Sequence, residues 1–414
     1  MKIAIYGVSR SGKDYLIKHL IKYFSGNSSI SACHIEGSSS LNIISKEKYN
    51  CSFKELSEYD KKIIRQEFTA LVNEKELEHQ LVIVDAHYAF IVDDTYKVVM
   101  TEEDKQVYNA FFYLDTPSNL IFNYSRNSEG EKKNLTINET DISDWKSFEK
   151  IGLSLICETL EKELIILDED TQSCISFIEC FIKNHDQKYA IKSIAKRLVN
   201  TFFNEIANTQ EVLIFDCDNT VSKNDVTYDF CRSMGVSTKE LKKIFRNDRY
   251  TSYQFFKVQN LYTNKGIKAN KKASLDALKH VILCEDITQL INNSNNAYIL
   301  GLTSGVYEIW TLVSQKNQLF DNLIGNSHDG DYFVTPSLKK QIVLELQNRE
   351  KKVCAIGDSM IDIPMLEVAN DGYIIAHQKL NHAVASYFQR IKKTSIQKFS
   401  SSTYCYDIHN MDIT

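Results

Sequence analysis

Short runs of consecutive apolar residues recur along the chain, and each is followed by a stretch with apolar residues spaced three or four apart. The first run covers residues 2–6, and helical spacing follows over 13–24. Continuous apolar runs are typical of parallel strands buried on both faces. The other runs in the first half lie near 31–36 and at 81–84, 111–114 and 164–167. The alternation predicts an α/β domain with a parallel sheet between two helical layers.

The same alternation restarts after a polar, helical stretch at residues 171–209, with apolar runs at 212–215, 297–300 and 353–356. A chain of 414 residues is too long for one ordinary core. We therefore predict two three-layer α/β domains with parallel sheets. The expected boundaries are 1–184 for the first domain, 185–209 for a helical linker, 210–395 for the second domain and 396–414 for a poorly ordered polar tail, with a helical cap at about 222–293.

The composition is that of a soluble globular protein, with 43% hydrophobic and 25% charged residues. The net charge of -5 provides no overall attraction to nucleic acid or to an anionic membrane. The ten cysteines include no C-x-x-C pair, which favours reduced thiols over disulfides or zinc. No apolar run approaches membrane-spanning length, so we expect a cytoplasmic protein without a membrane partner. The sequence leaves its oligomeric state open.

A glycine loop of the form G-x-x-x-x-G-K follows the first apolar run and opens the first helical stretch. In this context the glycines allow backbone amides to surround phosphates, and the lysine reaches the β and γ phosphates of a nucleotide. The motif predicts ATP binding. The loop residues expected to hold ATP are Gly7, Ser9, Ser11, Gly12 and Lys13.

Asp14 stands where such loops usually carry the Ser or Thr that binds Mg²⁺, and its carboxylate adds negative charge beside a triphosphate. Asp85 ends an apolar run and is a second candidate for Mg²⁺. Residues 1–170 resemble nucleoside-monophosphate-type kinases, and the segment around His87 resembles archaeal-type adenylate kinases. The resemblance implies an ATP-dependent small-molecule kinase in which Arg126 stabilises charge on the transferred phosphoryl group. His87 either faces the substrate or is structural.

Acidic residues follow two of the apolar runs in the second half. Asp216 and Asp218 follow the run at 212–215, and Asp358 and Asp362 follow the run at 353–356. Carboxyl ends of parallel strands are where α/β folds place their chemistry. An aspartate can attack phosphorus, a second acid can protonate the leaving group, and carboxylate oxygens suit Mg²⁺.

Four motifs in order, at residues 216–220, 303–305, 338–342 and 357–366, resemble the haloacid-dehalogenase phosphatases, with phosphoserine phosphatase as the nearest likeness. The resemblance covers about residues 210–380. It implies Asp216 as nucleophile and Asp218 as general acid and base. It also implies that Asp358 binds Mg²⁺ together with Asp216 and the backbone carbonyl of Asp218, while Asp362 supports the metal site.

Two positions of this resemblance have alternatives. Ser304 is the expected phosphate-binding hydroxyl, with Thr303 as the other alignment, and Lys339 is the expected cation, with Lys340 as the other. A cap over the site excludes water and favours small substrates. Cap residues either contact a substrate or are surface cations and cap core, and the positions in question are Arg246, Arg249, Tyr250, Tyr253 and Phe256.

These features predict a bifunctional enzyme: a Mg²⁺-dependent phosphatase acting on a small phosphorylated metabolite or nucleotide, joined to an ATP-dependent small-molecule kinase. One alternative is a polynucleotide kinase-phosphatase of nucleic-acid end repair, against which stand the large cap and the pI of about 6.1. A second alternative is a phosphatase regulated by a non-catalytic nucleotide-sensing domain.

Overall fold

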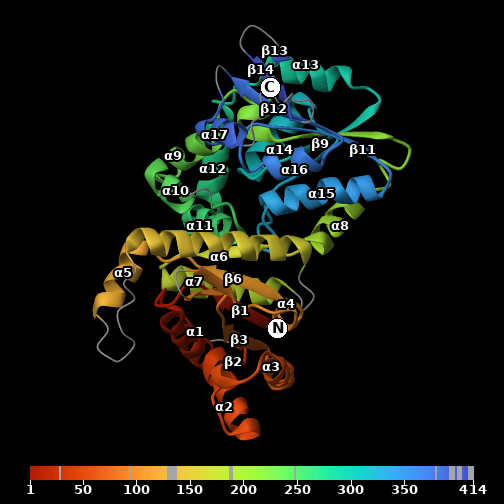
Figure 1. Ribbon diagram of the computed structural model, residues 1–414. Coiled ribbons are helices and arrows are strands. Elements are labelled where there is room, and N and C mark those ends of the chain that lie inside the picture. Colours follow the sequence, from red (N-terminus) through yellow and green to blue (C-terminus); the bar gives the residue numbers. More distant parts are fainter. Residues whose placement is uncertain are drawn as a thin grey trace. The chain divides into compact units, whose positions relative to one another are not determined.

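The computed structural model describes residues 1–27, 29–92, 95–127, 138–185, 190–246, 249–377, 380–390, 397–398 and 403–408. The chain divides into two compact units, Met1–Ala190 and Ile191–Thr414, each with its own mainly parallel sheet (Figure 1). The predicted α/β fold class is confirmed. Within the described part of the chain, no helix is both long enough and apolar enough to cross a bilayer.

The first unit contains a five-stranded sheet of order β2-β3-β1-β6-β7 in which every pair is parallel. The predicted apolar runs form its strands. They are β1 (Lys2–Tyr6), β2 (Ala32–Glu36), β3 (Leu81–Asp85), β6 (Ala110–Leu114) and β7 (Leu164–Leu167). Strands β2 and β3 lie on one side of β1, and the later strands β6 and β7 lie on the other side. The carboxyl end of β1 is therefore the switch point where such sheets bind ligands.

Helices cover both faces of this sheet. Phe68 of α3 and Leu153 of α6 pack in one cluster with Tyr6 of β1. On the opposite face, Phe112 of β6 contacts Phe181 of α7, with ring centroids 5.5 Å apart. The helices are α1 (Lys13–Asn27), α2 (Gly37–Tyr49), α3 (Glu58–Glu78), α4 (Glu102–Val107), α5 (Ser118–Asn127), α6 (Glu139–Thr159) and α7 (Thr171–Asn184), with a single 3-10 turn, η1 (Phe53–Glu55).

Two short strands of the first unit lie outside the main sheet and were not predicted. They are β4 (Ala89–Val92) and β5 (Thr95–Val98), which pair antiparallel. Strand β4 has a continuous apolar run, Ala-Phe-Ile-Val, but most of its residues are half-buried or exposed, and β5 has no such run and is exposed.

The second unit has a seven-stranded sheet of order β10-β9-β8-β11-β12-β14-β13. The strands are β8 (Glu211–Phe215), β9 (Ala297–Leu302), β10 (Asn322–Ile324), β11 (Lys352–Gly357), β12 (Asp371–His377), β13 (Gln397–Lys398) and β14 (Thr403–Asp407). The pairs from β10 to β12 are parallel, whereas β14 pairs antiparallel with β12 and β13. The expectation of a poorly ordered tail is therefore wrong for residues 403–408, because Thr403 and Cys405 are buried.

The helices over this sheet include one from the predicted linker. This helix, α8 (Ile191–Phe202), packs against α15 (Pro336–Asn348) and so belongs to the second unit. Ala195 and Val199 of this helix are fully buried. The remaining helices beside the sheet are α13 (Glu285–Asn293), α14 (Tyr307–Asn317), α16 (Ile363–Val368) and α17 (His382–Arg390).

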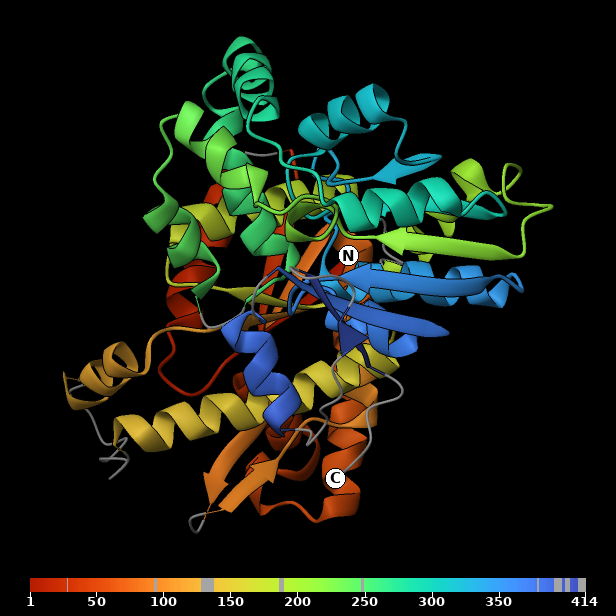
Figure 2. The same ribbon diagram turned by 90° about the horizontal axis from the view of Figure 1, so that it is seen from above.

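The chain segment that connects β8 to β9 contains four helices that form a separate cluster, coloured green in Figures 1 and 2. They are α9 (Val226–Ser233), α10 (Thr238–Ile244), α11 (Ser252–Thr263) and α12 (Ile267–Leu278), and we call them the cap. A bridge between Ser222 and Leu283 joins the two chain segments at its base. We end the cap at α12, short of the predicted 293, because α9 to α12 pack on one another, whereas α13 packs on the turn at Cys217–Val221 that follows β8.

Candidate active site

Three carboxylates meet at the carboxyl edge of the second sheet. Strands β8 and β11 are neighbours, with Phe215 opposite Ile356, so the residues that follow them come together. Single carboxylate oxygens of Asp216, Asp358 and Asp362 all lie within 4.8 Å of one another. The tertiary structure thus gathers acids from two motifs.

Lys339 lies beneath this acidic cluster and is fully buried. Thr335 caps α15 and Pro336 opens it, which places Lys339 in the first turn. Its Nζ lies 2.7 Å from Asp216 Oδ1 and 2.7 Å from Asp362 Oδ1. Lys339, rather than its neighbour Lys340, is therefore the lysine that reaches the acids.

Asp362 is held by donors on both of its oxygens. While Oδ1 pairs with Lys339, Oδ2 accepts hydrogen bonds from the backbone N–H of Asp358 at 3.2 Å and of Ser359 at 3.1 Å, and from the Ser359 hydroxyl at 2.8 Å. A Cβ on Gly357 would lie 2.5 Å from the Asp362 side chain, which explains the glycine. Asp362 therefore positions Lys339 and the loop that carries Asp358.

Asp218 is oriented by two groups that the sequence did not indicate. The turn at Cys217–Val221 places Asn219 in the left-handed region, with φ 56°. Asp218 Oδ1 accepts the N–H of Val226 at 2.8 Å, and Oδ2 accepts the indole N–H of Trp310 at 3.1 Å. A Cβ on Gly305 would collide with Asp218 Oδ2, so this glycine leaves room for the carboxylate.

The electrostatics of the cluster show an excess of negative charge. Burial, followed by the charge of Asp362, raises the pKa of Asp216 to about 7 even though Lys339 opposes the shift. Burial and the charges of Asp216 and Asp362 raise the pKa of Asp358 well above its ordinary value. The pKa of Asp218 is also well raised, by burial and then by the charges of Asp225 and Asp216.

The donor set fits a magnesium ion, which prefers carboxylate oxygens and water. Three carboxylates share one ammonium group in the cluster, so a divalent cation would offset the remaining charge. Asp216 and Asp358 are the better candidate ligands, because both Asp362 oxygens accept short hydrogen bonds, whereas Asp216 Oδ2 has a long contact of 3.5 Å from the Thr220 hydroxyl. The backbone carbonyl of Asp218 stays a predicted ligand.

A cavity of about 390 Å³ opens above the cluster and is lined by both sheet-edge and cap residues. Ser304 lines it, whereas Thr303 is completely buried and does not. The Ser304 hydroxyl donates to the Val334 carbonyl oxygen at 2.6 Å. Asn326, which sequence analysis missed, donates to the Ser304 carbonyl oxygen at 2.9 Å and also lines the cavity.

Of the five cap residues predicted to face a substrate, Tyr250 lines the cavity and the others do not. Tyr253 and Phe256 are buried, and so is Arg249 at 7% exposure, while Arg246 is half-buried. Tyr250 lies in the loop before α11 and Tyr253 in the first turn of that helix, so chain position alone did not separate them.

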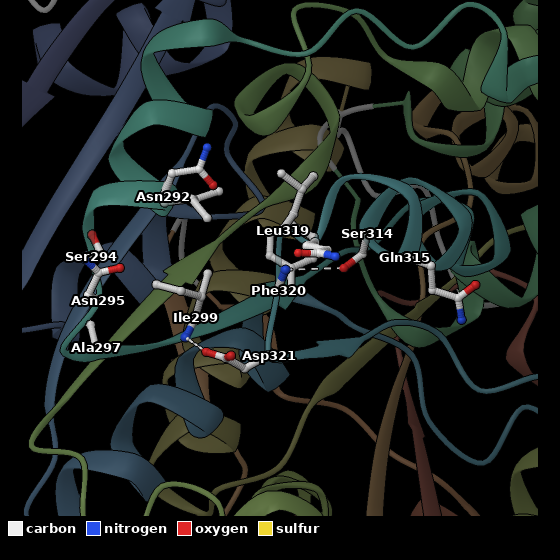
Figure 3. Close-up of a pocket in the computed structure, with 12 residues that line it drawn as sticks. Asn292, Ser294, Asn295, Ala297, Ile299, Ser314, Gln315, Leu319, Phe320 and Asp321 are labelled. Atoms are coloured by element: carbon white, nitrogen blue, oxygen red, sulfur yellow. Dashed lines mark hydrogen bonds between the residues drawn. The ribbon is translucent and has the colours of Figure 1, made fainter.

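A second cavity, of about 580 Å³, lies near the amino end of β9, away from Ser304 at the other end of that strand (Figure 3). Its lining is mostly neutral, with side chains such as Asn292, Asn295 and Gln315. Asp321 is the charged member, and its Oδ2 accepts the N–H of Ile299 at 2.7 Å. This lining offers neither a nucleophile paired with a base nor a set of metal ligands.

In the first unit, the glycine loop follows β1 as predicted. Lys13 is 5% exposed and its Nζ donates to the Gly7 carbonyl oxygen at 2.5 Å. Gly12 has φ 92°, a conformation that favours glycine. Ser11 is buried, and its carbonyl oxygen accepts the Thr116 hydroxyl at 2.6 Å, which ties the loop to the end of β6. Ser9 is half-buried in the same loop.

The other predicted nucleotide-site residues lie in three different surroundings. Asp85 Oδ1 accepts from His34 Nε2 and from the Gly37 N–H, both at 3.0 Å. Asp14 is exposed in the first turn of α1. Arg126 is exposed on α5, with its guanidinium 5.6 Å from the centroid of the Phe122 ring. The role of Arg126 in phosphoryl transfer stays a prediction.

Glu149 of α6 joins this region without any prediction from the sequence. It is completely buried and accepts the Ala89 N–H at 3.1 Å and the Tyr113 hydroxyl at 3.2 Å. Burial raises its pKa to about 7. The pKa of His87 falls to about 3, first through burial and then through the charge of Lys13. Lys13 therefore shares a low-dielectric region with a neutral imidazole and a buried carboxyl group.

Comparisons with known proteins give low similarity. No protein-family model and no curated protein matches this sequence. One similar structure is a phosphoserine phosphatase as a phospho-aspartyl intermediate analogue, with 21% identity over 39% of this chain and 84% of that chain, at a TM-score of 0.31. A protein of unknown function from Bordetella pertussis Tohama I has 14% identity over 44% of this chain and 96% of that chain, at a TM-score of 0.35.

A probable phosphoserine phosphatase from Vibrio cholerae has 14% identity over 39% of this chain and 55% of that chain, at a TM-score of 0.31.

Proposed function

We propose that the second unit is a magnesium-dependent phosphomonoesterase that acts through an aspartyl-phosphate. The observation that carries the proposal is the position of Asp216, which lies in the cavity floor between the buried ammonium of Lys339 and the second carboxyl group of Asp218. A nucleophile, a cation and an acid then act on the same reacting group.

In the first proposed step, Asp216 Oδ2 attacks phosphorus while Lys339 holds Oδ1, and the bond from phosphorus to the ester oxygen breaks. Asp218 gives a proton to the departing alcohol, which its raised pKa supports. In the second step, Asp218 takes a proton from water, and that water attacks phosphorus. The bond to Asp216 breaks, and the sum is one ester and one water converted to one alcohol and one phosphate.

Other residues have positioning roles in this proposal. Trp310 and Val226 orient the carboxyl group of Asp218, and Ser304 is the hydroxyl expected to hold a phosphoryl oxygen. A magnesium ion held by Asp216 and Asp358 would supply charge neutralisation for the phosphoryl group.

The test is turnover of an aryl phosphate by the Asp216→Asn protein with Mg²⁺ present. The proposal predicts a loss of at least about a thousandfold in kcat with an unchanged fold by circular dichroism. Asp371→Asn is a matched control. Asp371 is the first residue of β12, at the end of the strand opposite to the carboxyl edge, and it pairs with Lys352 at 2.9 Å. Equal turnover by both variants would refute the assignment of Asp216.

We further propose that the first unit binds a nucleoside triphosphate and transfers its phosphate to a small acceptor. Support comes from the buried Lys13, which lies over the glycine loop at the switch point of the sheet. The test is acceptor-dependent formation of ADP, with abolition by Lys13→Ala. Nucleotide binding without any ADP formation would instead favour the sensor alternative.

The cap over the acidic cluster favours small phosphomonoesters over a polynucleotide end, since a polymer would have to pass it. Hydrolysis of a 3′-phosphorylated oligonucleotide at a rate equal to that of small esters would revive end repair.

A further inference from the structure

The cap wall of the active-site cavity is built largely from aromatic and aliphatic side chains. Phe245 at the end of α10, Tyr250 in the following loop and Phe255 on α11 all line it. The Phe245 ring centroid lies 5.5 Å from that of Tyr250 and 5.4 Å from that of Phe255. Phe245 therefore joins the three rings, inclined to its own plane by 32° and 60°, into one aromatic surface of the cavity wall.

Helix α11 extends this surface along one of its faces. Phe255, Val258 and Tyr262 recur at three- and four-residue spacing, and all line the cavity. Phe255 and Val258 are 4% and 8% exposed, so each offers a small apolar area to the cavity. Tyr262 is braced edge-on against Phe230, with centroids 5.2 Å apart.

The cap is held against the sheet edge in this arrangement. Gln259 of α11 donates through Nε2 to the carbonyl oxygens of Ser327 at 3.1 Å and His328 at 2.9 Å. These two residues lie just beyond Asn326, which itself braces Ser304. The aromatic surface and the phosphoryl-transfer residues consequently belong to a single cavity of about 390 Å³.

Charged side chains of the cavity are concentrated at the phosphoryl end. Asp216, Asp218 and Asp358 lie there, and Asp225 caps α9 by accepting the Thr227 N–H at 2.9 Å. On the cap side, the lining includes one cation, the exposed Lys242. A small leaving group that carries its own carboxylate would meet the apolar side chains of the cap wall and the carboxylates of the phosphoryl end, which is unfavourable.

We propose that the alcohol released by this phosphatase carries an aromatic or other planar ring that stacks on the surface formed by Phe245, Tyr250 and Phe255. The inference rests on the proposed phosphatase function and names its substrate class. A cavity of about 390 Å³ suits a phosphate group with a ring-bearing alcohol, at the lower end of the usual size of ligand sites.

The experiment compares three phosphate esters of primary alcohols: 2-phenylethyl phosphate, ethyl phosphate and phosphoserine. Each is assayed with Mg²⁺ for phosphate release by the full chain. We expect kcat/KM for 2-phenylethyl phosphate to exceed that for each of the other two by at least about tenfold. The same order is expected in their binding to the Asp216→Asn protein, measured by calorimetry.

Two variants test the surface itself. Tyr250→Ala removes a half-buried ring and should reduce the ratio of kcat/KM between 2-phenylethyl and ethyl phosphate to within about twofold of one. Leu275→Ala, an exposed position of α12 at 45% that does not line the cavity, should keep the wild-type ratio. Phe245→Ala repeats the test at a second ring.

The outcomes separate the two proposals. Faster or equal turnover of phosphoserine or ethyl phosphate, or an unchanged ratio in both ring variants, would overturn the ring inference while the phosphatase stands. Absence of Asp216-dependent turnover with every ester would overturn the phosphatase. In that case the calorimetric comparison still decides the inference, and equal affinity for the three esters would refute it.

Discussion

Replacing Lys339 by methionine removes an ammonium group that contacts Asp216 and Asp362, each at 2.7 Å. Methionine has a similar length and leaves little empty space, so the main effect is electrostatic. Lys339 and Asp362 are completely buried and Asp216 is 8% exposed, so water cannot replace the lost partner effectively. The carboxylates of Asp216, Asp358 and Asp362 would then face one another without this cation.

Breaking a buried ion pair by removing one partner costs about 3–5 kcal/mol. In a unit of this size, the melting temperature should fall by about 10 °C. The size of the loss should depend on pH. The folded-state pKa of Asp216 is already raised to about 7, above its unfolded value, so its contribution to stability falls as pH rises through this range. Without Lys339 this pKa rises further, and the difference from the wild type should grow between pH 5 and pH 8.

The assay is chemical unfolding of the wild type, Lys339→Met and Lys340→Met, followed by circular dichroism at pH 5 and pH 8 without Mg²⁺. Lys340→Met is the matched control, since Lys340 is the next residue of α15 and is only half-buried. If the two variants have equal unfolding free energies at pH 8, or if the loss in Lys339→Met is larger at pH 5, the electrostatic account of this site is wrong.

Three further predictions concern single side chains. Gly305→Ala should lower kcat by about tenfold or more without loss of fold, because the new Cβ displaces Asp218; steady-state kinetics test this, and an unchanged kcat would contradict it. Glu149→Gln should stabilise the first unit increasingly from pH 5 to pH 8, by up to about 3 kcal/mol, because the raised folded-state pKa near 7 costs stability as pH rises. Thermal melts at both pH values decide it, and a larger gain at pH 5 would refute it. Asp358→Asn should weaken Mg²⁺ binding by at least about tenfold, measured as the rise in melting temperature with added Mg²⁺; an unchanged rise would exclude Asp358 as a ligand.

Much of the fold could be predicted because buried parallel strands have a local sequence pattern. The apolar runs at 2–6, 81–84 and 212–215 became β1, β3 and β8. Strand β14 was missed because it contains no aliphatic residue, and its position depends on pairing with β12 and β13. The end of the cap was misplaced because α13 has helical periodicity like the cap helices, and only its packing on the turn at Cys217–Val221 distinguishes it.

The residues that complete each site could not be predicted in the same way. Trp310 lies 92 residues from Asp218, and Glu149 lies 60 residues from the Ala89 amide it accepts. Neither residue belongs to a motif, because any side chain with a suitably positioned hydrogen-bond donor or acceptor could make the same contact. Asn326 likewise reaches Ser304 only through the turn that follows β10.

The sequence by itself determined that four acids follow strand-like runs and that a phosphate-type loop follows the first strand, because motif spacing and strand periodicity are local properties. Only the tertiary structure decided that Lys339 rather than Lys340 reaches Asp216, that Ser304 rather than Thr303 lines the cavity, and that Tyr250 rather than Tyr253 faces it. Neighbouring residues in a helix or strand point in different directions, and which direction leads into the site depends on how the elements pack.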